Sequence, residues 1–192
     1  MSASPIDRLP PLPPERMDAA QRAAADELIA GPRKGVKGPF IPLMRSPELL
    51  ARVGKLGEHL RFHTALSPRV SEFATLIVAR ALSQQFEWFV HVPLALKAGT
   101  HPDTISALCE GRRPVRMDED ETCVHDFSSE LLQHHGVADA TWQAALARFG
   151  ERGVVELTAL VGYFVMVSMV LNVAHTPPEG AAGVEALPPL PR

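Results

Sequence analysis

Cysteine is scarce in this sequence: two of its 192 residues are cysteines, Cys109 and Cys123. They form no CxxC pair and no metal-ligand spacing, so the sequence carries no signature of a dithiol centre or a structural zinc site. We interpret both as ordinary thiols in a reducing cytoplasm. The first residues also lack the charged start and apolar run of a signal peptide, which supports the expectation of a cytoplasmic protein.

Strong charge of one sign is also missing. The formal net charge is -3, and the only basic cluster is Arg33-Lys34 with Lys37. A nucleic-acid partner is therefore not expected. The sequence contains no GxGxxG, no GxxxxGK[ST] and no GxSxG, which excludes the common nucleotide-binding loops and the hydrolase nucleophile elbow.

One uncharged stretch, Leu157 to Ala174, reaches 18 residues. That length only just spans a bilayer. The stretch holds polar Ser168 and Asn172 and has no basic cluster beside it. We therefore expect a helix buried in the fold or at a subunit interface, and no membrane partner.

The hydrophobic pattern between the two ends of the chain is helical throughout, with no convincing strand. We predict an all-α fold of about seven or eight helices in a single domain over residues 15–176. It is preceded by a Pro-rich arm at 1–14 and followed by a flexible tail at 177–192, rich in Pro, Gly and Ala. The helices are expected over 15–30, from 47, from 68, over 84–98, over 101–111, over 118–135, over 139–149 and over 153–174.

Three groups able to handle protons, Glu72, Glu87 and His91, lie within apolar sequence. Glu87 and His91 are four residues apart, which puts both side chains on one face of a helix. Glu72 precedes a short break near Ser83–Gln85, so an antiparallel helix pair would bring it back onto the same site. Carboxylates among apolar neighbours are costly unless paired, and we predict an acid–base site here.

The segment from Glu72 to Gly99 resembles the carboxymuconolactone decarboxylase family, an all-α superfamily that includes alkylhydroperoxidase D (AhpD). The resemblance rests on Glu72, on Glu87 and His91 followed by Ala95 and Gly99, and on the final helix from Glu156. It covers roughly residues 30–175. It implies an AhpD-like helical fold and a homo-oligomer, either a trimer or a hexamer.

The sequence departs from the peroxidase members of that family. Those members carry a glutamate, then CxxC, then a histidine, and this alignment puts Gln84 and Glu87 at the two cysteine positions. A peroxidase of this type needs one thiolate to attack peroxide and a second thiol to resolve the product. An antioxidant peroxidase therefore remains only as an alternative.

The decarboxylase branch instead has a Glu-x-x-x-His signature, which Glu87 and His91 match. The resemblance then implies a lyase that acts on a small organic acid or lactone with no metal and no organic cofactor. His91 would protonate a carbanion-like centre or polarise a carbonyl, Glu87 would fix the imidazole, and Glu72 would hold or relay a proton. A non-catalytic oligomeric scaffold is the third hypothesis.

Five residues are candidates for substrate binding. Arg80, or Arg33 from the Gly31–Pro42 loop, would meet a substrate carboxylate. Gln84 would either cap its helix or line the pocket edge, and Trp88 would be either a core residue or a stacking surface. The full set is Arg80, Gln84, Trp88, Phe40 and His63.

Overall fold

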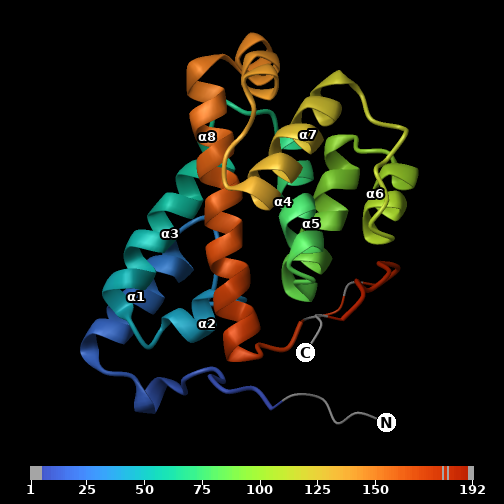
Figure 1. Cartoon of the computed structure of the whole chain (residues 1–192). Coiled ribbons are helices and arrows are strands. Elements are labelled where there is room, and N and C mark those ends of the chain that lie inside the picture. The colour runs from blue at the N-terminus through green and yellow to red at the C-terminus, as the bar shows by residue number, and fades with distance from the viewer. Residues whose placement is uncertain (1–5, 179, 181, 190–192) are drawn as a thin grey trace.

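The computed structural model describes residues 6–178, 180 and 182–189, and these residues form helices and loops with no strand, as predicted. Figure 1 shows the long helix α8 in the middle of the molecule, with α3 on one side and α4 and α7 on the other. The elements are η1 (Pro14–Arg16), α1 (Ala19–Ala30), α2 (Phe40–Leu43), α3 (Pro47–Phe62), α4 (Pro68–Ala81), α5 (Gln85–Ala98), α6 (Pro102–Cys109), α7 (Glu119–His134) and α8 (Asp139–Ala174).

Local signals set most of the helix ends. The Ser67 side chain accepts a hydrogen bond from the Val70 amide at the start of α4, with Pro68 at the first helical position. Gly99 ends α5 with a φ of 102°, a left-handed conformation that favours glycine. The first helix begins later than predicted, at Ala19, because Asp18 forms a capping box with Gln21.

The two last predicted helices form one continuous element with a kink. Gly150 has φ 68° and ψ 174°, which breaks the helical path inside α8. By length and composition α8 could cross a membrane, but its most apolar window is 56% buried within this chain. That burial is typical of the core helix of a globular domain.

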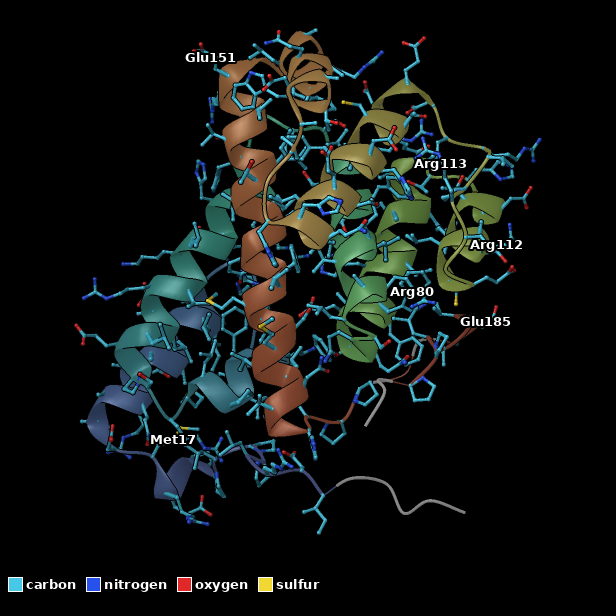
Figure 2. The ribbon with its side chains drawn as sticks, viewed as in Figure 1. Met17, Arg80, Arg112, Arg113, Glu151 and Glu185 are labelled. Carbon is cyan, nitrogen blue, oxygen red and sulfur yellow. The ribbon has the colours of Figure 1, made fainter. Side chains whose placement is uncertain are left out.

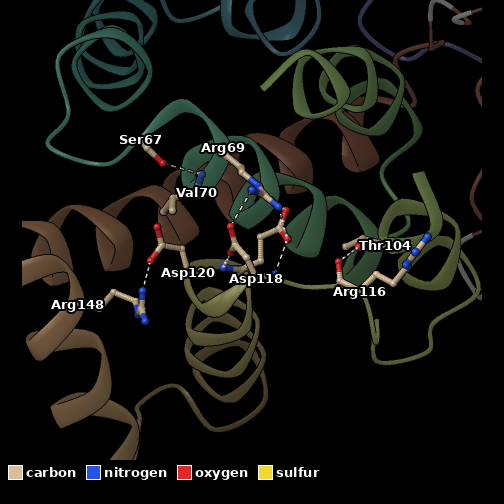
Figure 3. A network of polar contacts seen from close by, with 9 residues as sticks. Ser67, Arg69, Val70, Thr104, Arg116, Asp118, Asp120 and Arg148 are labelled. Atoms are coloured by element: carbon tan, nitrogen blue, oxygen red, sulfur yellow. Dashed lines mark hydrogen bonds and ion pairs between the residues drawn. The ribbon is translucent and has the colours of Figure 1, made fainter. Parts of the chain in front are cut away.

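A buried ion pair connects α4 to α7. The Nε and Nη2 atoms of Arg69 each donate to the Glu121 carboxylate at 2.9 Å, and Glu121 is fully buried. The second Nη of Arg69 lies 2.7 Å from Asp118, the capping residue of α7 (Figure 3). Because both ends of the bidentate pair are charged, this contact fixes how the two helices pack.

A second carboxylate, Glu156, connects α8 to the loop between α3 and α4. It accepts hydrogen bonds from the Thr64 hydroxyl at 2.7 Å and the Ala65 amide at 2.6 Å. Arg152 donates to it at 2.8 Å, and a ring nitrogen of His59 lies 3.3 Å away. Burial raises the pKa of Glu156, but these donors outweigh it and lower the pKa to about 2.

The described part of the C-terminal segment, expected as a flexible tail, is instead packed against α5. Gln85 exchanges two hydrogen bonds with the backbone of Leu187, at 2.7 and 3.0 Å, and Leu187 is buried. The Trp88 indole donates to the Glu185 carbonyl at 2.9 Å. Figure 2 labels Glu185 on the flank of the molecule where α6 ends. Backbone groups that no helix satisfies thus find side-chain partners on α5.

Candidate active site

His91 lies on α5 between two carboxylates. Its Nδ1 donates to Glu72 Oε2 of α4 at 2.5 Å, and its Nε2 lies 3.3 Å from Glu87 Oε2, one turn earlier on α5. His91 is 2% exposed, and its ring packs edge-on against Phe164 of α8 at 5.1 Å between centroids. The adjacent packing of α4 and α5 therefore brings the three predicted residues together.

The carboxylates decide the protonation of the imidazole. Burial lowers the pKa of His91, since a charged ring is costly in an apolar interior, but the hydrogen bonds that the ring donates to Glu72 and Glu87 outweigh it. The pKa of His91 is therefore raised above its ordinary value. The two carboxylates therefore favour the protonated form of the imidazole, a form that can give up a proton.

A cavity of about 260 Å³ opens beside this histidine. Both Glu87 and His91 line it, whereas Glu72 does not and so lies behind the imidazole. The cavity is lined by Pro32, Arg33, Gly35, Lys37, Pro39, Phe40, Arg61, Phe62, Phe86, Glu87, Val90, His91, Tyr163, Phe164 and Val167. An acid–base pair at the wall of a mostly apolar cavity with a few polar groups is the usual form of a small-molecule site.

Three cations face the same cavity: Arg33, Lys37 and Arg61. The Arg33 guanidinium stacks over the ring of Phe40 at 4.4 Å. Burial lowers the pKa of Arg33, and Tyr163 and Glu87 act in the opposite direction. These side chains give the cavity a region suited to an anionic group.

Two of the residues predicted to bind substrate serve packing instead. Gln84 caps α5 through the Phe86 amide and donates to Asn172 of α8 at 2.8 Å. Trp88 is 1% exposed in the core and lies outside the cavity lining. The sequence had left two roles open for each residue; the structure shows Gln84 as a helix cap and Trp88 as a core residue. Phe40 does line the cavity.

The structure contradicts the placement of Arg80 and His63 at the site. Arg80 donates to the Cys109 carbonyl at 2.8 Å and lies with Arg112 and Arg113 on the flank beside α6 (Figure 2). His63 follows the end of α3, with its side chain 63% exposed and 3.9 Å from Glu58. Neither lines the cavity.

The two cysteines lie elsewhere. Cys109 is buried at the end of α6, with its sulfur 3.8 Å from the Ala186 carbonyl, and Cys123 lies on α7. Burial raises the pKa of both thiols, which disfavours the reactive thiolate. Within the described ranges, no group of three His, Cys, Asp or Glu residues is arranged to hold a metal ion.

Sequence reasoning assigned no role at the site to three polar cavity residues: Tyr163, Arg61 and Lys37. Tyr163 carried a usable signal, since it is the single tyrosine of the chain and stands in an otherwise apolar helix. A phenol in such a place needs a polar partner. Lys37 belongs to the basic cluster noted in the sequence, Arg33-Lys34 with Lys37, whereas nothing in the local pattern of α3 marks Arg61.

Comparison with known proteins agrees with the fold and the motif. Residues 47–121, which contain Glu72, Glu87 and His91, match the model of the carboxymuconolactone decarboxylase family. No curated protein matches the chain. A crystal structure described as an alkylhydroperoxidase AhpD core, an uncharacterized peroxidase-related protein from Ralstonia eutropha JMP134, superposes with a TM-score of 0.73. The two chains are 15% identical in sequence, and the matched region covers 92% of this chain and 94% of the Ralstonia chain.

At that identity the superposition supports the fold alone, while the family match covers the segment that builds the site. The chain has an AhpD-like helical fold, and its residues 47–121 are similar to the carboxymuconolactone decarboxylase family, without a CxxC pair in the sequence.

Proposed function

We propose that this protein is a cofactor-free acid–base catalyst, a lyase that acts on a small carboxylated or lactone substrate. One observation carries the proposal: His91 is held between Glu72 and Glu87, at 2.5 and 3.3 Å, at the wall of a cavity that also contains three cations. A protonated imidazole beside a carboxylate can deliver a proton and take one back. The cations suit a substrate carboxylate.

The distances favour a different division of roles from the one that the family resemblance implies. Glu72 makes the short contact to Nδ1 from behind the ring, so it fixes the tautomer and orientation of His91. Glu87 faces the cavity and is the carboxylate that meets the substrate. Glu72 thus acts through His91, while Glu87 and His91 form the catalytic pair.

A decarboxylation in this site balances without an oxidant or a metal. The bond between the carboxylate carbon and its neighbour breaks, and the electron pair passes to an adjacent carbonyl oxygen as an enolate. Carbon dioxide leaves, and the imidazolium of His91 gives its proton to the enolate carbon. His91 is then reprotonated from solvent through Glu87.

The volume of the cavity restricts the substrate. Ligand pockets usually measure about 300–1,000 Å³. At about 260 Å³ this cavity suits a small organic acid or lactone. The apolar rings of Phe40, Phe86 and Phe164 would cover the carbon skeleton and exclude water from the reacting centre.

The experiment is a turnover assay on small 3-oxo acids and carboxylated lactones, with release of carbon dioxide as the readout. Activity should fall at least about 100-fold in His91→Ala and Glu87→Gln, the range expected for a lost general acid or base. His63→Ala is the matched control, because this exposed histidine lies outside the cavity. Full activity in His91→Ala would overturn the proposal.

The peroxidase alternative is tested by the same assay with a hydroperoxide as substrate. Cys109→Ser combined with Cys123→Ser should leave lyase turnover unchanged, because neither sulfur lines the cavity. Hydroperoxide reduction that disappears in this double variant would instead favour a thiol peroxidase.

We also propose that the protein is a homo-oligomer. The outer face of α8 leaves Val155, Met169 and Val173 more than half exposed, and an apolar helix face of this kind is best covered by another subunit. Light scattering should give a trimer or a hexamer, and a monomer at micromolar concentration would contradict the proposal. If no member of the substrate panel turns over while the oligomer persists, the scaffold hypothesis gains support.

A further inference from the structure

Tyr163 is buried at the cavity with an unused hydrogen-bond donor. It is 5% exposed, on the turn of α8 beside Phe164. Its hydroxyl has one partner among the described residues, Arg33 Nη2 at 3.5 Å. A guanidinium only donates, so the phenol oxygen accepts from Arg33 and its own O–H remains free to donate. Tyr163 is one of the residues that line the cavity, so a ligand there is the available acceptor for this O–H.

Arg33 and Arg61 also have unused donors. No described carboxylate lies within ion-pair distance of either residue, and the Arg61 Nε is buried without a partner. Buried donors of this kind are costly unless something accepts from them. An oxygen-rich anion inside the cavity would accept hydrogen bonds from all of these donors.

A glycine on α3 makes room for this arrangement. A Cβ atom on Gly57 would lie 2.1 Å from the Tyr163 hydroxyl and 2.5 Å from Arg33 Nη2, far inside contact distance. Glycine inside a helix is less stabilising than alanine, because its backbone loses more conformational freedom on folding. Gly57 therefore makes α3 less stable than alanine would, but it leaves room for the Tyr163 phenol and the Arg33 guanidinium to come into contact.

The same groups are electrostatically coupled to the acid–base pair. Burial raises the pKa of Tyr163 most strongly, Arg33 opposes this, and the charge of Glu87 raises it further. Glu87 therefore lies close enough to influence the phenol. The phenol stays protonated, and so it remains a donor at neutral pH.

We propose that Tyr163 and Arg33 form the oxygen-binding half of the site, donating to the substrate carbonyl oxygen that becomes the enolate. This inference rests on the proposed function. As the bond to the carboxylate breaks, negative charge grows on that oxygen, and both donors bind it more strongly than they bind the neutral carbonyl. No proton leaves Tyr163: His91 supplies the proton to carbon. A substrate without an oxygen next to the cleaved centre would gain nothing from this pair.

Binding of oxalate tests the inference without turnover. Oxalate is a small dianion whose oxygens can accept hydrogen bonds from both Tyr163 and Arg33, and it serves as a probe of the oxygen-binding pair. By titration calorimetry, Tyr163→Phe should weaken oxalate binding about 10- to 100-fold, the effect of one hydrogen bond to a charged group. Arg33→Met should weaken it at least as much, and Arg33→Lys should restore part of the affinity. Glu87→Gln should not weaken it, because that change removes a negative charge.

Two glycine variants test the geometry. Gly57→Ala should weaken oxalate binding like Tyr163→Phe, because the added Cβ displaces the phenol and the guanidinium. Gly54→Ala is the matched control, since its Cβ would meet only Leu28 Cδ2 at 3.6 Å, an ordinary contact. Thermal unfolding by circular dichroism shows whether each variant folds. Equal effects of the two glycine variants would overturn the assigned role of Gly57.

The outcomes separate this inference from the proposed function. If Tyr163→Phe lowers kcat more than it changes KM and weakens oxalate binding, both stand. If Tyr163-dependent oxalate binding occurs but no panel compound turns over, the oxygen-binding pair stands and the lyase proposal fails. If the wild type does not bind oxalate, or Tyr163→Phe binds it equally well, the inference is wrong even where turnover is observed.

Discussion

The two carboxylates that flank His91 should respond in opposite ways to neutralisation. One imidazolium faces two carboxylates, so Glu72, Glu87 and His91 by themselves carry one excess negative charge, which Arg33 across the cavity offsets only in part. The contact to Glu72 is 2.5 Å and the contact to Glu87 is 3.3 Å. The stronger pair is therefore the one with Glu72, and the excess charge is mainly that of Glu87.

Glutamine at either position keeps the shape and one acceptor oxygen. Hydrogen bonds to charged groups contribute about 1.5–3 kcal/mol and neutral ones about 0.5–1.5, so Glu72→Gln should lower the free energy of unfolding by about 1–2 kcal/mol. Glu87→Gln should lower it by at most about 0.5 kcal/mol, or raise it, because it removes the excess charge. A catalytic group that costs stability is common in enzymes.

The pH dependence follows from the raised pKa of His91. A group whose folded pKa lies above its unfolded value of about 6.5 stabilises the protein fully below that value. This stabilisation is lost as the pH rises through the folded pKa. Glu72→Gln lowers the pKa of His91 relative to the wild type, and its stability should therefore change less with pH over this interval.

Denaturant unfolding at about pH 6 and about pH 9, with NMR titration of the His91 ring, measures these effects. The matched comparison is Glu72→Gln against Glu87→Gln, two equal chemical changes on the same imidazole. The reasoning is refuted if Glu87→Gln is the more destabilising of the two. It is also refuted if the pKa of His91 is unchanged in Glu72→Gln.

Two further predictions concern the carboxylates that hold α8 and α7 in place. Glu156→Gln should lower the free energy of unfolding by about 1–3 kcal/mol, whereas exposed Glu151→Gln should have little effect. Because the pKa of Glu156 is lowered to about 2, its stabilisation is present above its ordinary value of 4.5 and lost as the pH falls toward 2; acid unfolding curves should show a flatter dependence in the variant. Arg69→Met should cost about 3–5 kcal/mol, because it leaves the fully buried Glu121 without its partner. The control Arg148→Met removes exposed ion pairs to Glu119 and Asp120 and should change the free energy of unfolding far less in the same denaturant titration; equal costs would contradict the buried-pair reasoning.

The helices were predictable because their ends are encoded locally. Ser67 followed by proline, Asp118 three residues before Glu121, and Gly99 each act within a few residues of sequence. The side-by-side position of Glu72, Glu87 and His91 needed one tertiary assumption, an antiparallel turn at the break after α4. The structure meets that assumption between Ala81 and Gln85.

Of the residues expected to bind substrate, Phe40 and Arg33, the alternative to Arg80, do line the cavity, whereas Arg80 and His63 lie away from it. Arg80 follows Glu72 by eight residues, which is about 12 Å along a helix, so it lies beyond the site. Arg61 and His63 are two residues apart, and residues at that spacing do not share a helix face. The choice of cavity residue therefore depends on which face α3 presents to α8, and helical periodicity does not give that rotation.

The packing of the C-terminal segment against α5 was not predictable for a related reason. Its composition predicts a loose chain, since it is rich in Pro, Gly and Ala and offers few apolar side chains. Its anchors are backbone groups bonded to Gln85 and Trp88, with Leu187 buried. Backbone acceptors are the same in every sequence, so composition does not reveal that a distant helix supplies their donors.

The start of α5 is where this sequence departs from the pattern of the peroxidase members. The family resemblance places Gln84 and Glu87 where the peroxidase members have their cysteine pair. In this chain Gln84 caps the helix and donates a hydrogen bond to Asn172 of α8, so the residue at the first of these positions stabilises the packing of α5. Glu87 lies one helical turn later, faces the cavity and contacts Nε2 of His91. A thiol at that second position would lie beside the same histidine, so under the proposed function Glu87 handles protons at the place where a peroxidase would have a thiol.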